Sequence, residues 1–113
     1  MRLLFICTGN VARSPAAAAV IRELAPGAHE TRSAGISPFC PRPVTDADLE
    51  WADLVAVMEP DHAVFIAERW PGLDWKVRVL DVEDRYHRDD PALRALLESR
   101  LSDLVGARKR GEG

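Results

Sequence analysis

The sequence predicts an α/β fold, built as a single domain around a four-stranded parallel sheet with helices on both faces. The length of 113 residues suits one domain, and 47% hydrophobic residues are enough to form a core. Short apolar runs alternate along the chain with longer amphipathic segments. This alternation is typical of a β-α-β-α-β-α-β-α order, in which the strands lie parallel.

The first half of the chain opens with an apolar run at residues 3–6, which is typical of a buried parallel strand. Ser14 and Pro15 have the pattern of a helix start, with Ser as the N-cap and Pro at the first helical position. Good helix formers fill residues 16–24. Residues 29–33 are more polar, and we expect them to form a second strand near a sheet edge.

The second half continues the alternation after a loop at residues 34–43 that contains three prolines. Thr45 and Asp48 are three residues apart, as an N-cap and its partner in a capping box are, so a short helix should begin there. The remaining elements follow in the same order. They are a strand at 54–58, an amphipathic helix at 61–70, a strand at 76–80, a polar loop at 81–90 and a helix at 91–105.

We expect residues 1–105 to form the domain and residues 106–113 to be a polar, flexible tail. The three tryptophans, at positions 51, 70 and 75, should lie in the core. The three histidines, at 29, 62 and 87, are too widely spaced to predict a metal site, since metal ligands must converge. No metal and no cofactor are therefore expected.

Charge and hydropathy exclude several classes of function. The net charge of −3 is unlike the basic surface of a nucleic-acid-binding protein. No stretch approaches the roughly 20 apolar residues of a membrane span, and the first apolar run is too short for a signal peptide. The two cysteines do not form a disulfide framework, so we expect reduced thiols in a cytoplasmic protein.

The segment after the first strand, Cys7 to Ser14, has the composition of an anion-binding loop. Five residues separate Cys7 from Arg13, and a helix follows at once. A loop of that length can turn its backbone N–H groups inward, next to the positive end of the helix dipole. Gly9 and Asn10 are the residue types that most readily adopt left-handed backbone angles. The fold therefore places a phosphate-binding loop after its first strand.

The same loop should activate the thiol of Cys7. A cysteine near N–H donors, an arginine and a helix N-terminus has its pKa lowered from about 8.5 to roughly 3.5–7.5. Ser14 can donate a hydrogen bond to the resulting thiolate, and Arg13 can bind two phosphoryl oxygens with parallel N–H groups. These residues predict a cysteine-dependent phosphate monoester hydrolase. Two alternatives stay open: a buried structural thiol, and an anion-binding loop without turnover.

The run from Leu4 to Pro15 resembles the low-molecular-weight protein tyrosine phosphatases, whose signature is an apolar strand followed by C-x-G-N-x-C-R-S-P. One position differs, because Ala12 stands where the family usually has a second cysteine. Ser33-Ala34-Gly35, the run at 53–59 and the run at 79–84 also resemble family segments. Within the family the chain is similar to a compact bacterial subgroup of predicted tyrosine phosphatases, with Asp84-Arg85-Tyr86 in place of D-P-Y.

The resemblance implies a role for each matching residue. Cys7 would attack phosphorus and form a thiophosphate intermediate. Arg13 and the amides of Thr8, Gly9, Asn10, Val11, Ala12 and Arg13 would bind the phosphoryl oxygens. Ser14 would stabilise the thiolate as it leaves, and Asn10 would hold the loop shape. Asp84 would be the general acid, with Asp81 as the alternative, while Asp89 and Asp90 suit the start of the last helix.

The substrate implied is a phosphotyrosine protein or a small aryl phosphate, with inorganic phosphate or sulfate as loop ligands. The loop that supplies an aromatic wall in larger family members is short here. Phe39 would form part of a wall or pack within its proline-rich loop, and Tyr86 would line the pocket or pack the acid loop. Cys40 would protect Cys7 as a disulfide partner or have no role. Arsenate reduction is a minor alternative, since residues 54–90 contain no resolving cysteine.

Overall fold

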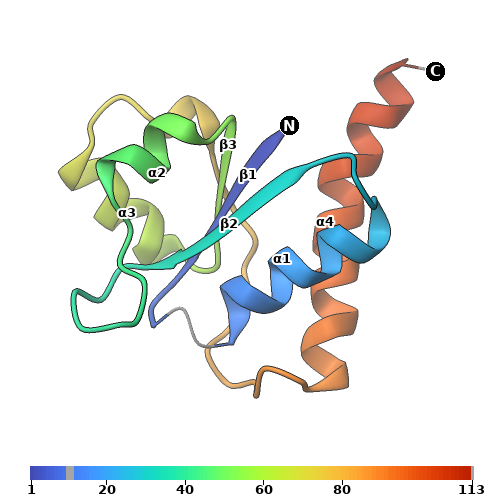
Figure 1. The fold of residues 1–113 in the computed structure, drawn as a ribbon, viewed down its shortest axis with the longest axis horizontal. Helices are drawn as coiled ribbons and strands as arrows, with labels where there is room; N and C mark the ends of the chain where they lie inside the picture. The colour runs from blue at the N-terminus through green and yellow to red at the C-terminus, as the bar shows by residue number, and fades with distance from the viewer. Residues whose placement is uncertain (10–11, 113) are drawn as a thin grey trace.

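A computed structural model describes residues 1–9 and 12–112, with side chains through residue 102. Four parallel strands form one sheet in the order β2-β1-β3-β4 (Figure 1). The strands are β1 (Arg2–Cys7), β2 (Glu30–Gly35), β3 (Leu54–Val57) and β4 (Val77–Val79). The predicted α/β fold with a parallel sheet is confirmed, and β2 lies at a sheet edge as its polar sequence indicated.

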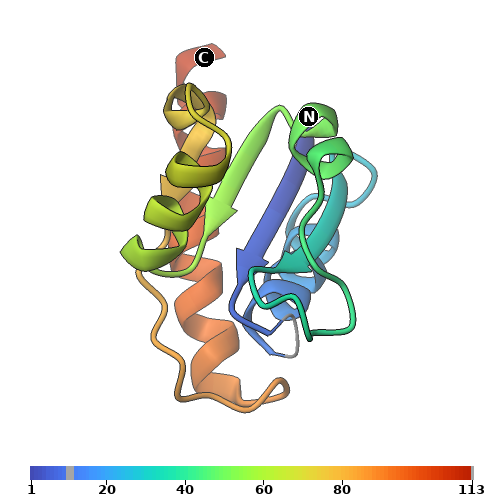
Figure 2. The same cartoon turned by 90° about the vertical axis from the view of Figure 1, so that its left-hand side faces the viewer.

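The helices cover both faces of the sheet, with α1 and α4 on one side and α2 and α3 on the other (Figures 1 and 2). Their bounds are α1 (Arg13–Leu24), α2 (Asp46–Trp51), α3 (Pro60–Arg69) and α4 (Pro91–Glu112), with a short 3₁₀ turn, η1 (Asp74–Lys76), before β4. No helix of the part of the chain that the structure describes is long and apolar enough to cross a membrane.

Strand β1 is the centre of the core because it is buried on both faces. Leu3, Phe5 and Cys7 point to the layer of α1 and α4, and Leu4 and Ile6 point to the layer of α2 and α3. Successive side chains of a strand alternate between faces, so a central parallel strand needs an unbroken apolar sequence. The run that ends at Cys7 therefore places the cysteine at a fixed depth, at the edge of the core.

The capping box predicted for α2 is present. Thr45 Oγ1 accepts a hydrogen bond from the Asp48 N–H at 3.2 Å, and the Asp48 carboxylate accepts one from the Thr45 N–H at 3.1 Å. Arg42 and Arg32 also contact this buried carboxylate, at 2.7 and 3.3 Å. The hydrogen bond from Arg42 is the largest cause of the low pKa of Asp48, which is about 2.

Four local expectations were wrong. Helix α1 begins at Arg13, and Ser14 does not cap it, because the Ser14 hydroxyl contacts the Cys7 thiol instead. The last helix continues to Glu112, since good helix formers follow Gly106. Strand β4 begins at Val77 because η1 occupies the residues before it. In that turn Trp75 is exposed, whereas Trp51 and Trp70 pack partly against the core.

Candidate active site

The Cys7 loop follows the carboxyl end of β1, the strand that lies between β2 and β3 in the sheet. Chain connections diverge here, with β2 on one side of β1 and β3 on the other, and such a switch point is where open α/β sheets bind ligands. The backbone of the segment after β2 runs beside the loop. Ile36 N–H donates to the Cys7 carbonyl and Ser37 N–H donates to the Thr8 carbonyl, each at 3.0 Å.

The Cys7 thiol is buried, and its Sγ lies 3.1 Å from the Ser14 hydroxyl oxygen. Ser14 is in the first turn of α1 and is itself fully buried. A hydroxyl in this position can donate a hydrogen bond to a thiolate, and the N-terminus of α1 favours negative charge nearby. The predicted pair of Cys7 and Ser14 is therefore brought together by the fold.

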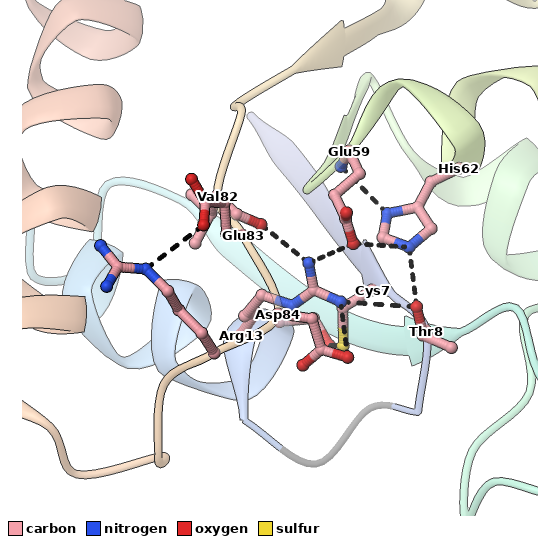
Figure 3. Close-up of polar contacts among 10 residues, drawn as sticks. Cys7, Thr8, Arg13, Glu59, His62, Val82, Glu83 and Asp84 are labelled. Carbon is pink, nitrogen blue, oxygen red and sulfur yellow. Dashed lines mark hydrogen bonds and ion pairs between the residues drawn. The ribbon is translucent and has the colours of Figure 1, made fainter.

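Arg13 is the most connected side chain of the site, and only 2% of its surface is exposed (Figure 3). Its NH1 nitrogen donates to Glu59 Oε2 at 2.6 Å and to the Val82 carbonyl at 2.7 Å. Its NH2 nitrogen lies 3.4 Å from Thr8 Oγ1 and 3.7 Å from Asp84 Oδ2.

These contacts decide which edge of the guanidinium can bind an anion. The two hydrogens on NH1 are directed to Glu59 and to Val82. The Nε–H and NH2 edge is then the fork that is left to bind two phosphoryl oxygens. The NH1 side of the Arg13 guanidinium is therefore held by the Glu59 carboxylate and the Val82 carbonyl. Its NH2 group lies on the side of the loop, near Thr8.

Glu59 and His62 complete the site, and the sequence analysis did not identify either as functional. Glu59 precedes α3 as its N-cap, and its backbone N–H donates to His62 Nδ1 at 3.1 Å. His62 Nε2 lies 3.0 Å from Thr8 Oγ1 (Figure 3). Burial, followed by the positive charge of Arg13, lowers the pKa of His62. One signal was available: Glu59 follows the strand beside β1 and reaches the same sheet edge as Cys7.

The loop after β4 brings Asp84 to the site. Its side chain is 68% exposed and faces the NH2 group of Arg13. Buried Val82, which contacts Arg13 through its carbonyl, anchors the same loop. Asp81 is exposed and has a left-handed φ of 56° at the exit from β4. Asp90 accepts a hydrogen bond from the Ala92 N–H at 2.8 Å, in the first turn of α4, as its position before Pro91 indicated.

The remaining candidate residues lie at the margin of the site or outside the described chain. Phe39 is 95% exposed on the loop after β2, so it does not pack within that loop. Tyr86 packs partly against the core of the α1 and α4 layer, and its hydroxyl lies 3.0 Å from Arg85 NH2. Cys40 is a half-buried free thiol. Asn10 and Val11 lie outside the described residues, between Gly9 and Ala12.

Among the residues that the structure describes, no group of three His, Cys, Asp or Glu side chains converges as a metal site would require. A thiol and a guanidinium beside the start of a helix are instead suited to binding an oxyanion, with Glu59 holding the guanidinium in place.

Comparison with known proteins shows a likeness to phosphatases. The family model described as low molecular weight phosphotyrosine protein phosphatase matches residues 2–39. No curated protein matches the chain.

Solved structures resemble the chain over nearly its whole length. YwlE arginine phosphatase from Geobacillus stearothermophilus is 25% identical with a TM-score of 0.77, over 99% of this chain and 97% of that one. The tyrosine phosphatase Wzb from Escherichia coli K30, in complex with phosphate, is 25% identical with a TM-score of 0.79, over 94% and 96%. SP-PTP, the low molecular weight protein tyrosine phosphatase from Streptococcus pyogenes, shares the fold, with 18% identity and a TM-score of 0.83 over 94% and 91%. The match over residues 2–39, the fold and the placement of Cys7 and Arg13 make the chain similar to the low molecular weight protein tyrosine phosphatases, and they support a phosphatase.

Proposed function

We propose that the chain hydrolyses phosphate monoesters through a thiophosphate intermediate on Cys7, with phosphotyrosine proteins or small aryl phosphates as substrates. The observation that carries the proposal is the position of one thiol, Cys7, at the start of a helix, 3.1 Å from a buried hydroxyl and beside a guanidinium that is held by Glu59. These contacts favour a thiolate and a bound oxyanion at the same place.

In the first step the loop amides from Thr8 to Arg13 and the Nε–NH2 edge of Arg13 bind the phosphoryl oxygens. The Cys7 sulfur forms a bond to phosphorus, and the bond from phosphorus to the leaving oxygen breaks. Asp84, in its acid form, gives its proton to that oxygen. The proximity of Asp84 to Arg13 supports this role, since an acid that serves the leaving group must lie beside the phosphoryl site.

In the second step water attacks the phosphorus of the intermediate. The Asp84 carboxylate takes a proton from this water, and the sulfur–phosphorus bond breaks to release phosphate and the Cys7 thiolate. A hydrogen bond from Ser14 lowers the energy of the departing thiolate. Inorganic phosphate and sulfate are the expected loop ligands, and the related Wzb structures contain phosphate and sulfate.

A second substrate class, phosphoarginine, is favoured by one observation. YwlE, which is 25% identical to the chain, is an arginine phosphatase. A phosphorylated guanidine also needs a proton on its leaving nitrogen, which Asp84 can supply from its position beside the phosphoryl site.

The test compares three substrates, p-nitrophenyl phosphate, a phosphotyrosine peptide and a phosphoarginine peptide, between pH 5 and 8. The wild-type chain and the Cys7→Ser variant are measured side by side. We expect turnover by the wild type alone, while the variant still binds inorganic phosphate in a calorimetric titration. Hydrolysis by Cys7→Ser would refute the thiophosphate route. Phosphate binding without hydrolysis by the wild type would instead assign the chain as a phosphate-binding relative.

The general acid is tested with two leaving groups. Asp84→Ala should slow turnover of phenyl phosphate far more than turnover of p-nitrophenyl phosphate, because nitrophenolate leaves readily without a proton. An equal loss for both esters would remove Asp84 from this role and favour Asp81.

A further inference from the structure

His62 is a buried polar side chain that the mechanism above does not use. It lies in the first turn of α3, 2% exposed, with both ring nitrogens in contact with polar groups. Nδ1 contacts the Glu59 N–H at 3.1 Å, and Nε2 contacts Thr8 Oγ1 at 3.0 Å. The ring therefore joins the N-terminus of α3 to the residue that follows the nucleophile.

The partners of the ring determine its tautomer. A backbone N–H can only donate, so Nδ1 must carry the lone pair that accepts from Glu59. In a neutral imidazole the proton is then on Nε2, which donates to the Thr8 hydroxyl oxygen.

Burial favours the neutral form of the ring. Burial and Arg13, which reaches it from α1, lower the pKa of His62, and this outweighs the opposite effect of Glu59, Asp61 and Asp84. A protonated ring would also turn Nδ1 into a donor that faces the Glu59 N–H. The neutral tautomer with its proton on Nε2 is thus favoured by geometry and by burial.

The Thr8 oxygen consequently receives two donors. One is His62 Nε2 at 3.0 Å and the other is Arg13 NH2 at 3.4 Å. A hydroxyl oxygen has two lone pairs, so both are occupied, and the group can interact further only through its own hydrogen. That hydroxyl lies beside the NH2 group of the anion-binding edge of Arg13, on an exposed residue of the loop.

We infer that the Thr8 side chain is a phosphate-binding donor, and that His62 is the positioning residue that fixes the Thr8 hydroxyl as a donor to the bound phosphoryl group. The inference rests on the proposed oxyanion site and adds a side-chain donor to its backbone amides. His62 touches no reacting atom and acts only through Thr8. Thr8 contributes one more hydrogen bond to the negative charge that develops on the phosphoryl oxygens.

The test uses substitutions of His62 that keep the contact made by one ring nitrogen and remove the contact made by the other. His62→Gln places an amide N–H near the position of Nε2 and keeps a donor to Thr8. His62→Asn reaches only the position of Nδ1, so it can accept from Glu59 but not donate to Thr8. Thr8→Val removes the hydroxyl while keeping the side-chain shape, and Thr8→Ser keeps the hydroxyl. Thr31→Val, on β2, is the matched control.

We expect Thr8→Val to lower kcat/KM for p-nitrophenyl phosphate by about tenfold to a hundredfold, since one oxyanion donor is lost. Its affinity for inorganic phosphate, measured by calorimetry, should fall as well. His62→Asn should show the same loss, and the Thr8→Val/His62→Asn double variant should lose no more than either alone. Thr8→Ser and His62→Gln should retain most of the wild-type activity, and Thr31→Val should match the wild type.

Wild-type kinetics and phosphate affinity in Thr8→Val would overturn the inference, as would independent, additive losses in the double variant. If His62→Asn does not fold, the contrast between Thr8→Val and Thr8→Ser still decides the matter. If the wild type hydrolyses no ester, the proposed phosphatase mechanism fails, and the phosphate affinities of the same variants test the Thr8 donor by themselves.

Discussion

Replacing Glu59 by glutamine tests the claim that Glu59 holds Arg13 in place through the NH1 side of its guanidinium. The variant keeps the size and shape of the side chain and an oxygen that can accept from Arg13, but it removes the negative charge. Arg13 is almost fully buried and its bond to Glu59 is 2.6 Å long, as expected for a charge-assisted contact. Loss of the charge leaves the NH1 group of the buried guanidinium with neutral acceptors alone, the amide oxygen of the variant and the Val82 carbonyl.

The size of the effect follows from burial. A hydrogen bond to a charged group contributes about 1.5–3 kcal/mol, and breaking a fully buried pair costs about 3–5 kcal/mol. The Glu59 side chain is 36% exposed, so water partly compensates for its loss and the lower range applies. We expect kcat/KM for p-nitrophenyl phosphate to fall by roughly 10- to 150-fold, at about 1.4 kcal/mol for each factor of ten.

The assay is steady-state kinetics at pH 6–7, with thermal denaturation of each variant to separate misfolding from misplacement of Arg13. Glu83→Gln is the matched control, because that carboxylate belongs to the loop after β4 and forms an exposed pair with Arg85. Exposed pairs contribute about 0–1 kcal/mol, so this control should behave almost as the wild type. Equal kinetics for Glu59→Gln and Glu83→Gln would refute the reasoning.

Two further predictions concern Asp48 and Asp81. Asp48 has a folded pKa of about 2, lowered chiefly by Arg42. Its contribution to stability is present above the unfolded value near 3.8 and is lost as pH falls toward 2. In urea titrations at pH 7, Asp48→Asn should therefore be less stable than the wild type by about 1–2 kcal/mol after allowing for screening by solvent, and the difference should shrink at pH 2.5. A constant difference at both pH values would contradict this. Asp81→Gly should raise the free energy of unfolding by about 0.5–1 kcal/mol, because glycine adopts the φ of 56° without strain. Its kcat should be unchanged if Asp84 is the acid, and a large loss of kcat would instead favour Asp81.

The features that the sequence predicted well depend on neighbouring residues. The apolar run before Cys7, the loop residues and the helix after them are adjacent in the chain, so the position of the thiol could be inferred directly. The capping box of Thr45 and Asp48 is equally local, since it needs only three residues of spacing. The alternation of strands and helices gave the parallel sheet because crossover connections leave few other arrangements.

The features that the sequence did not predict depend on the order of the strands in space. Glu59 and His62 follow β3, and they reach Cys7 only because β3 lies beside β1. In the sequence, no neighbouring residue distinguishes His62 from the two other histidines as part of a site. Ser14 matched the N-cap pattern, but its hydroxyl contacts the thiol instead. The prediction that Trp75 lies in the core was wrong, because Trp75 belongs to η1 and its ring is on the surface.

The contacts of Arg13 have a consequence for local unfolding. This one side chain ties α1 to the residue before α3 and to the loop that carries Asp84. If that loop detached, the guanidinium would lose its hydrogen bond to the Val82 carbonyl, which is costly for a charged group. The loop should therefore open together with the start of α1, as one cooperative unit. In hydrogen exchange, the amides of these segments should become accessible at a similar free energy, although they are about seventy residues apart in the chain.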